Sequence, residues 1–417
     1  MSVLKPFKAI RPVVEQAAKV ASRPYDVLNT QEARDEAEGN AVSFLHVIKP
    51  EIDFDDSQNP YAPEIYAKGK SNFDQLVEDG VLVQDEGEFL YVYELTMDGR
   101  TQTGLVGCNA IDDYFNNNIK KHELTRPDKE EDRKNHVRVG KMNAEPVFFS
   151  YPAVKAIDNL VDMVKGHDAP EYDFIAEDGI HHALWVIRDG EIIRQMVELF
   201  ETDVPSIYVA DGHHRTAAGA LVGREFREAN ANHKGHERYN FFMSVLFPDN
   251  QLQIIDYNRV VKDLNGHSSE EFIAQLGESF EVEAKGSDAY RPEGLHTIGM
   301  YLDQQWYKLT AKAGTYDDND PVGVLDVTIL SNKVLEPLLN IVDLRRDKRI
   351  EFVGGIRGLG ELEKRVNSGE MKVAFAMYPV SMQQLIDISD NDMIMPPKVT
   401  WFEPKLRSGL FVHSLED

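Results

Sequence analysis

The sequence has a single cysteine, Cys108, among its 417 residues. One thiol can form neither an intrachain disulfide nor a four-cysteine zinc site, and such sparing use of cysteine is typical of a reducing compartment. Long apolar runs are also missing. Nowhere do about 18 apolar residues follow one another, and the first charged residues are not followed by the apolar stretch of a secretion signal. We therefore expect a cytoplasmic protein that has no membrane partner.

Positive charge is the second scarcity. Lysine and arginine number 45 against 71 aspartate and glutamate residues, which gives a formal net charge of −26. This field repels nucleic-acid backbones and anionic membranes, so we expect no nucleic-acid partner. A strongly negative charge also serves solubility and does not define a substrate. If the substrate is a phosphate, however, its site must contain a local cluster of basic groups.

The rest of the composition is that of a globular protein, with 42% hydrophobic and 28% charged residues. The length is sufficient for two or three domains. Strand and helix patterns follow one another irregularly, which predicts the α+β class with mixed or antiparallel strands. The polar stretch 262–266 is the predicted boundary between an N-terminal region, 1–262, and a C-terminal α/β domain, 263–417.

Apolar periodicity and turn residues predict the individual elements. The predicted strands cover residues 42–48, 89–95, 101–106, 147–149, 183–187, 206–210, 240–247, 252–261, 297–302 and 372–377. The predicted helices cover residues 13–20, 31–38, 191–200, 216–230, 270–276 and 382–388.

The strongest local signal is a strand, a tight turn and a helix within residues 206–230. Gly212 lets the backbone turn sharply between the two elements. The amide groups at the start of the helix and their partial positive charge suit a phosphate oxygen. Arg215 can chelate the same anion through two hydrogen bonds. The segment therefore predicts an anion site.

The other side chains of this turn fit the same interpretation. Asp211 ends the strand, where it can hold a magnesium ion or orient an imidazole. His213 and His214 supply donors whose charge varies near neutral pH. The alternative is that Asp211 caps the helix and the two histidines are polar surface residues.

A second polar cluster contains His122, Glu123 and Arg126 within a charged stretch. A carboxylate beside a histidine and several cations can act as a general base. The cluster is not a metalloprotease helix, because Arg126 stands where the second histidine would be required. A solvated charged face is the alternative. His181 and His182 have no spaced carboxylate or cysteine partner, which argues against a zinc site there.

Four motifs, taken together, resemble a known family. They are Pro-Tyr-Asp-Val at 24–27, His-Glu-x-Thr-Arg-Pro at 122–127, Asp-Gly-His-His-Arg at 211–215 and Pro-Pro-Lys-x-Thr-x-Phe-x-Pro-Lys at 396–405. The chain resembles a bacterial family long described as a domain of unknown function, which is similar to the free L-serine kinases. The resemblance implies a ParB/sulfiredoxin-like catalytic domain with a mixed sheet and a second α/β domain.

The resemblance also implies roles for matching residues. Glu123 corresponds to the catalytic glutamate, the 211–215 segment to the part that binds donor phosphates and Mg²⁺, and Lys398 with Thr400 to the part that binds serine. The chain departs from the pattern at the acceptor end. Lys121 replaces a proline before His122, and the pair at 401–402 is Trp-Phe instead of Arg-His.

We therefore predict a kinase that phosphorylates free L-serine, with inorganic pyrophosphate as the preferred donor. The predicted site consists of catalytic Glu123, Asp211 and His214; phosphate-binding Gly212, His213, His214, Arg215 and Arg126; substrate-binding His122, Thr125, Lys398 and Thr400; and Asp211 as the ligand of Mg²⁺. ADP or ATP as donor and another alcohol as acceptor are alternatives. A ParB-like nucleotide-binding regulator on DNA is a further one, which the net charge of −26 disfavours.

Overall fold

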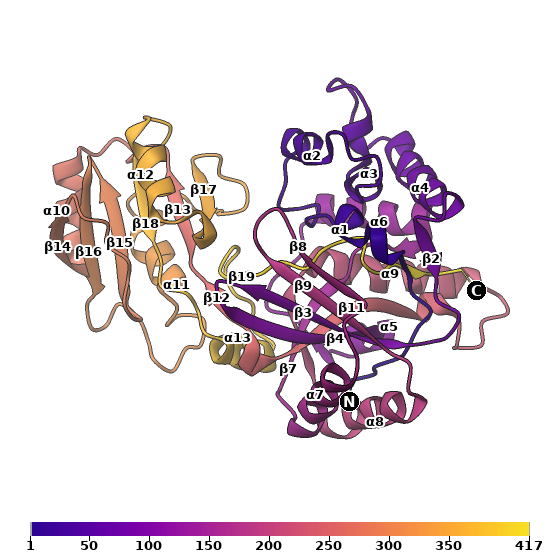
Figure 1. The fold of residues 1–417 in the computed structure, drawn as a ribbon. Helices are drawn as coiled ribbons and strands as arrows, with labels where there is room; N and C mark the ends of the chain where they lie inside the picture. The colour runs from indigo at the N-terminus through magenta and orange to yellow at the C-terminus, as the bar shows by residue number, and fades with distance from the viewer. Residues whose placement is uncertain (1, 417) are drawn as a thin grey trace. The chain divides into compact units, whose positions relative to one another are not determined.

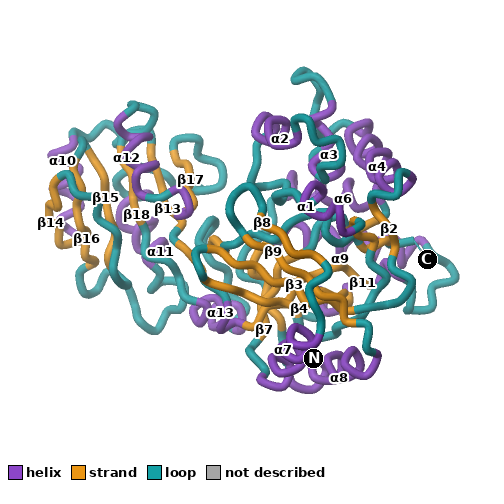
Figure 2. The backbone as a smooth tube through the Cα atoms, in the orientation of Figure 1, coloured by secondary structure: helices purple, strands orange, loops and turns teal. Residues whose placement is uncertain are grey.

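A computed structural model describes residues 2–416, which form two compact units. Unit 1 contains the chain up to Lys121, residues 125–252 and the segment from residue 404 onward. Unit 2 contains residues 122–124 and 253–403. The chain thus passes from one unit to the other four times. Figures 1 and 2 show the elements of both units.

Unit 1 is built on an eight-stranded mixed sheet with the strand order β5-β10-β7-β11-β4-β3-β9-β8. Most neighbours are antiparallel, but β10 runs parallel to β5 and β11 runs parallel to β7. The strands are β3 (Leu90–Met97), β4 (Arg100–Ala110), β5 (Ile119–Lys120), β7 (Val147–Tyr151), β8 (Tyr172–Ile175), β9 (His181–Ile187), β10 (Ile207–Asp211) and β11 (Phe241–Pro248). Two short pairs accompany it, formed by β1 (Ile10–Pro12) with β2 (Leu82–Gln84) and by β6 (Met142–Asn143) with β20 (His413–Ser414).

The helices of unit 1 lie on both sides of this sheet (Figure 1). They are α1 (Ala17–Val20), α2 (Thr30–Ala37), α3 (Leu45–Ile48), α4 (Pro63–Glu78), α5 (Ile111–Phe115), α6 (Pro127–Gly140), α7 (Lys155–His167), α8 (Gly190–Asp203) and α9 (His213–Ala229). Because successive side chains of a strand point to opposite faces of the sheet, β3 contributes side chains to both faces. Leu90 and Val92 join the core that α7 and α8 cover. Tyr91 and Tyr93 contact Phe411 of the last segment.

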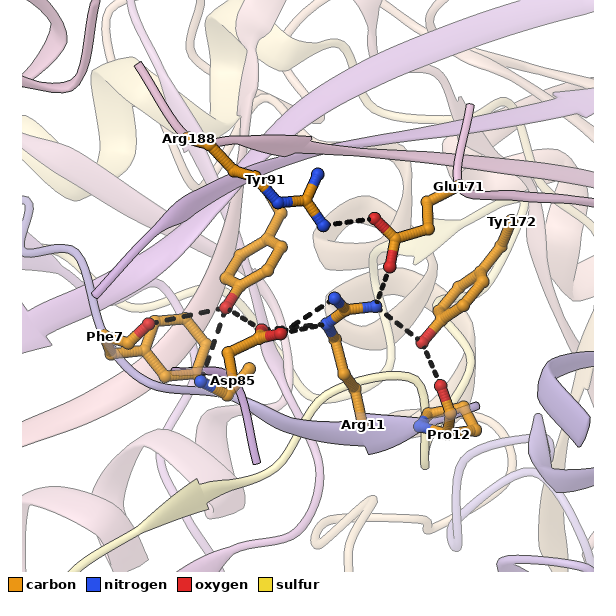
Figure 3. Close-up of polar contacts among 9 residues, drawn as sticks. Phe7, Arg11, Pro12, Asp85, Tyr91, Glu171, Tyr172 and Arg188 are labelled. Carbon is orange, nitrogen blue, oxygen red and sulfur yellow. Dashed lines mark hydrogen bonds and ion pairs between the residues drawn. The ribbon is translucent and has the colours of Figure 1, made fainter. Parts of the chain in front are cut away.

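A buried ion network fastens the N-terminal stretch to the sheet (Figure 3). The Arg11 guanidinium lies 2.8 Å from the Asp85 carboxylate and 2.6 Å from that of Glu171. It also donates to the Tyr172 hydroxyl at 3.0 Å, and the Tyr91 hydroxyl donates to Asp85 at 2.7 Å. Each buried charge therefore has an opposite charge and further hydrogen-bond partners, as burial requires.

The residues 404–416, called the C-terminal segment below, complete unit 1. Their backbone forms antiparallel bridges that join Ser408 to Ser22 and Val412 to Ile10, and β20 pairs with β6. Figure 1 shows this segment in yellow among the indigo and purple elements of the N-terminal part. The N-terminal part of the chain and the C-terminal segment thus belong to the same compact unit.

Unit 2 is built on a six-stranded antiparallel sheet with the order β14-β16-β15-β18-β13-β17. The strands are β13 (Tyr257–Val261), β14 (Phe280–Gly286), β15 (Thr297–Leu302), β16 (Gln305–Ala311), β17 (Ile350–Gly354) and β18 (Val373–Ala376). The helices are α10 (Ser269–Ser279), α11 (Asp326–Leu330), α12 (Leu359–Asn367) and α13 (Met382–Asp390), and β12 (Ile254–Ile255) pairs with β19 (Trp401–Phe402). Trp306 is fully buried between this sheet and α12, where its indole donates to Glu363 at 2.8 Å.

The α+β class with a mixed sheet and a second sheet-containing unit is confirmed. The prediction of a strand at 42–48 is wrong, because Leu45–Ile48 form helix α3. The helix predicted at 13–20 is divided into a 3-10 turn, Val14–Gln16, and the short α1. Within residues 2–416, none of the helices combines the length and the apolar character needed to span a bilayer.

Candidate functional site

The turn at residues 211–215 follows an irregularity at the end of β10. Val209 pairs with Phe149 and Asp211 pairs with Phe148, so Ala210 is an extra residue in the ladder. Bulges of this kind change the direction of the next side chain and often lie beside functional sites. Asp211 is therefore the last residue of the strand and also the first residue of the turn.

Gly212 connects the strand to α9 with φ 90° and ψ 37°. This left-handed conformation is accessible to glycine without steric cost. A Cβ atom at this position would lie 2.9 Å from the Nε atom of Arg215. The Gly212 carbonyl accepts from the amide and the hydroxyl of Thr216, at 2.9 and 3.0 Å. The sharp turn predicted at Gly212 is present, and α9 begins directly behind it.

Asp211 faces two cations. Its Oδ2 atom lies 3.0 Å from Arg215 Nη2 and its Oδ1 atom lies 3.4 Å from Lys405 Nζ. Burial disfavours the charged carboxylate, but Lys405 and Arg215 together hold the pKa of Asp211 well below its usual range. Gly212, not Asp211, is the N-cap of α9, and no side chain caps this helix. The interpretation of Asp211 as a helix cap is therefore wrong.

Arg215 is held from two sides, and only 6% of its side chain is exposed. Besides the ion pair with Asp211, it donates to the carbonyl of Pro146 at 2.8 Å. Burial opposes the charge of the guanidinium, yet nearby Asp26, Asp211 and Glu145 raise the pKa of Arg215 above its usual value. A permanently charged guanidinium thus lies directly beneath the turn.

Further buried charges surround Arg215. Arg133 pairs with Asp132 at 2.8 Å and with Glu145 at 3.4 Å, and its guanidinium lies 3.7 Å from the centre of the Tyr25 ring. The backbone amide of Tyr25 donates to Glu145 at 3.2 Å. Burial raises the pKa of Glu145, which Arg215 and Arg133 partly oppose. The first motif, at 24–27, therefore belongs to the charge network behind the 211–215 turn.

A cavity of about 40 Å³ adjoins this network, and its lining includes Arg133, His136, Glu145 and Arg215. This volume is enough for a few water molecules but not for a nucleotide. The cavity can therefore hydrate the buried charges.

His122 and Thr400 lie together in unit 2. His122 is 1% exposed, and its Nε2 atom lies 3.2 Å from the Thr400 hydroxyl. The His122 carbonyl accepts from the amide of Met395 at 2.8 Å. Glu123, the next residue, is half-buried. The second and the fourth motif are therefore joined by a direct hydrogen bond between His122 and Thr400.

Lys398 is exposed and adopts the left-handed conformation, with φ 60°. Its ammonium lies 5.7 Å from the centre of the Tyr257 ring, and its carbonyl accepts from Arg259 at 2.9 Å. Trp401 lies edge-on to Tyr257 with ring centres 5.0 Å apart, and Phe402 pairs with Ile254 in the small sheet. The Trp-Phe departure at 401–402 thus has a structural role.

Thr125 and Arg126 belong to unit 1. The Thr125 hydroxyl donates to Glu130 at 2.6 Å, and Arg126 pairs with Asp128 at 2.9 Å while about half of its side chain is exposed. An exposed ion pair of this kind is weak, so Arg126 can exchange its partner. Their predicted roles in substrate and phosphate binding stay predictions.

The structure therefore presents two groups of predicted site residues, one in each unit. The 211–215 turn lies in unit 1, and His122, Glu123, Lys398 and Thr400 belong to unit 2. Sequence reasoning gave no role to Lys405, which contacts Asp211, or to Tyr25 and Glu145 behind Arg215. Lys405 is the last residue of the fourth motif, and its place in that motif was the sequence feature that could have indicated a role.

Comparison with known protein families gives a match over most of the chain. A family model described as "Protein of unknown function (DUF1015)" matches residues 4–328. No curated protein matches the chain. Three solved structures are similar at low identity. A conserved hypothetical protein from Pyrococcus furiosus is 13% identical, with 73% of this chain and 94% of that chain covered and a TM-score of 0.37.

The second is a free serine kinase in complex with AMP, which is 12% identical, with 73% of this chain and 91% of that chain covered and a TM-score of 0.36. The third is SbnI with a C-terminal truncation from Staphylococcus aureus, 12% identical, with 74% and 86% covered and a TM-score of 0.38. These values carry no conclusion about the activity of this chain, which must come from its own residues.

Proposed function

The chain belongs to the family described as proteins of unknown function (DUF1015), and we propose that it is a small-molecule kinase. It transfers a phosphoryl group, from inorganic pyrophosphate as preferred donor, to the hydroxyl of free L-serine. The observation that carries this proposal is the 211–215 turn, where a bulge, a left-handed glycine and the start of a 17-residue helix meet the side chains of Arg215 and Lys405.

The turn has the properties that a phosphate donor needs. The first amide groups of α9 have no acceptor within the helix, and the helix dipole adds a partial positive charge. Arg215 supplies a full charge that its partners keep in place. Phosphoryl transfer depends mainly on positioning and charge compensation, so such a site contributes the larger part of the catalysis.

Asp211 fits the magnesium ion that the family resemblance implies. Magnesium prefers oxygen ligands and is commonly bound through one or two carboxylates together with substrate phosphates. Asp211 stays ionised, because its pKa is lowered, and 27% of its side chain is exposed. When bound, the ion would neutralise donor charge; Asp211 would hold it.

The acceptor group is proposed to consist of Glu123, His122, Thr400 and Lys398. Glu123 takes the proton of the serine hydroxyl while the hydroxyl oxygen attacks phosphorus. The bond from phosphorus to the bridging oxygen breaks, and orthophosphate leaves with the bonding electrons. Within unit 2, the hydrogen bond between His122 and Thr400 joins the residue before Glu123 to the segment that carries Lys398. Lys398 offers its ammonium to the serine carboxylate.

Two residues after Glu123, the chain enters unit 1 again with Thr125 and Arg126. Thr125 and Arg126 are then proposed to contact the substrate and the transferred group from the start of α6.

The direct test is to incubate the protein with Mg²⁺, L-serine and one donor at a time. Pyrophosphate, ADP and ATP are compared, and phosphoserine is measured by mass spectrometry. We expect product with pyrophosphate. Ethanolamine and L-threonine in place of serine test the acceptor, and titration with CTP and duplex DNA tests the regulator alternative. The serine-kinase proposal fails if none of the three donors yields phosphoserine.

Glu123→Gln removes the proposed base while the size of the side chain is kept. We expect turnover to fall about 10²- to 10⁴-fold, with a smaller change in the KM of the donor. Steady-state kinetics with the preferred donor measure both parameters. Glu270→Gln, at an exposed position of α10 in unit 2, is the matched control and should leave turnover unchanged. Near-normal turnover of a folded Glu123→Gln variant would remove Glu123 from the mechanism.

A further inference from the structure

Asp211 has two cationic partners that differ in how firmly they are held. Arg215 is buried and has a second bond to the carbonyl of Pro146 at 2.8 Å. Lys405 is 13% exposed, and its ammonium lies 3.4 Å from Asp211, longer than the usual 2.7–2.9 Å of a charged hydrogen bond. Of these two cations, Lys405 makes the longer contact with the carboxylate, 3.4 Å against 3.0 Å, and has the more exposed side chain, so it is the one better placed to leave.

The backbone next to Lys405 is fixed by a buried cluster two residues further along. The Arg407 guanidinium pairs with Asp178 and donates to His182 Nε2 at 3.3 Å, and the Arg407 amide donates to the Tyr93 hydroxyl at 3.4 Å. The same hydroxyl lies 2.8 Å from His182 Nδ1. Burial and the charge of Arg407 lower the pKa of His182 to about 3, so its ring is neutral.

The backbone that follows Lys405 is therefore anchored. Ser408, the next residue after Arg407, forms antiparallel bridge hydrogen bonds with Ser22, 2.8 and 3.0 Å long. A lysine ammonium on four flexible carbons can reach different acceptors from one backbone position. An anchored backbone and a long, flexible side chain suit a residue that serves two acceptors in turn.

We propose that Lys405 exchanges partners during the reaction. Without a donor it neutralises Asp211. When a divalent cation binds Asp211, the Lys405 ammonium turns to the phosphoryl oxygens of the donor. This inference rests on the proposed function and assigns a phosphate-binding residue to it. The exchange keeps the carboxylate compensated in both states, so the buried charge is never left without a counter-charge.

The exchange makes opposite predictions for two ligands. Lys405→Met removes the competitor for Asp211, so the affinity for Mg²⁺ alone should rise about 2- to 5-fold, the value of one partly exposed ion pair. The same substitution removes a donor to phosphate, so pyrophosphate in the presence of Mg²⁺ should bind about 10- to 100-fold more weakly. A purely structural role of Lys405 would weaken both.

Isothermal titration calorimetry of the full chain measures both affinities. Lys165→Met is the matched control, because Lys165 in α7 also pairs a partly exposed ammonium with a carboxylate of unit 1, that of Glu94. It should change neither affinity. Lys405→Arg retains the charge and should recover much of the pyrophosphate affinity. Circular dichroism confirms that each variant is folded.

The outcomes separate the inference from the proposed function. If the wild-type protein binds pyrophosphate and Lys405→Met does not raise the Mg²⁺ affinity, or does not weaken pyrophosphate, the exchange is refuted while the kinase proposal stands. If the wild-type protein binds neither pyrophosphate nor ADP nor ATP, the kinase proposal falls, and the exchange falls with it. Opposite shifts for the two ligands support the exchange.

Discussion

Two sets of charged residues, one in each unit, differ in how their charges are compensated. In unit 1, Asp211 and Arg215 form an ion pair, and each has a further partner, Lys405 for the carboxylate and the Pro146 carbonyl for the guanidinium. In unit 2, Arg259 and Asp326 are at least as deeply buried, with 1% and 3% exposure, and neither belongs to an ion pair within the part of the chain that the structure describes.

Arg259 lies in β13, where its guanidinium donates to the backbone carbonyls of Tyr257 and Lys398 and lies 5.4 Å from the centre of the Phe352 ring. Burial lowers the pKa of Arg259 to about 10. Asp326 accepts one hydrogen bond, from the His296 amide at 2.7 Å. Its second oxygen has no partner among the described residues, and burial raises the pKa of Asp326 to about 7.

The comparison shows what a carboxyl group needs in order to stay ionised inside a protein. Near Asp211 the opposite charges outweigh the cost of burial, and ionisation is favoured. At Asp326 burial acts almost alone, so the neutral form is favoured instead. A site that binds phosphate and metal requires the first arrangement, because its groups must be charged before the ligand arrives.

The largest effect is expected from breaking the compensated pair. Arg215→Met leaves Asp211 and Glu145 with less positive charge nearby, so the free energy of unfolding should fall by about 3–5 kcal/mol. Urea-induced unfolding followed by circular dichroism measures it. Arg194→Met in α8, where 61% of the arginine side chain is exposed, is the control and should cost about 0.5 kcal/mol or less. A loss below about 1 kcal/mol for Arg215→Met would contradict the comparison.

Asp326→Asn should change how stability depends on pH. The folded pKa of about 7 lies above the usual 3.8, so the folded protein keeps a proton that the unfolded chain releases. The contribution of this proton to the free energy of unfolding is fully present below about pH 4. It is lost as the pH rises toward 7, at about 1.4 kcal/mol per pH unit and at most about 4 kcal/mol.

In Asp326→Asn that loss is absent, so the variant should gain stability relative to the wild type between pH 4 and 7 and keep the gain above pH 7. Urea unfolding at several pH values measures the difference. Asp318→Asn, at an exposed position, is the control. A difference between Asp326→Asn and the wild type that does not vary with pH would show that Asp326 is not protonated in the folded protein.

The smallest effect is expected at Arg259. Arg259→Met removes two hydrogen bonds to carbonyls but also removes an uncompensated buried charge, so the two contributions largely cancel and unfolding should change by about 1 kcal/mol or less. The same urea experiment measures it. A loss as large as that of Arg215→Met would mean that the guanidinium of Arg259 is compensated after all.

The 206–230 segment shows how much of the site was predictable. Its strand, glycine turn and alanine-rich helix are specified by neighbouring residues, and β10, Gly212 and α9 occur where the sequence predicts them. The partner of Asp211 was not predictable in this way, because Lys405 reaches it through the return of the C-terminal segment to unit 1. No local pattern near Lys405 specifies that return.

The stretch at 42–48 shows the corresponding limit for the fold. A short apolar run fits a buried strand or a buried helix equally well. Here Phe44, Leu45, Val47 and Ile48 all enter one core cluster, and Phe44 lies against Gly409 of the C-terminal segment, where a Cβ atom would come within 2.6 Å of its ring. Long-range packing therefore decided in favour of the helix, and the sequence around residue 44 does not reveal it.

The late position of the C-terminal segment has a consequence for biosynthesis. Residues 253–403 of unit 2 are translated before residues 404–416. Unit 1 therefore lacks its last strand, β20, and Lys405 until unit 2 has been synthesised. At the usual elongation rate of about 5–20 residues per second, that interval is roughly 8–30 s. A nascent chain interrupted in this interval carries the 211–215 turn without the ammonium of Lys405, so Asp211 of a prematurely terminated product lacks one of its two cationic partners.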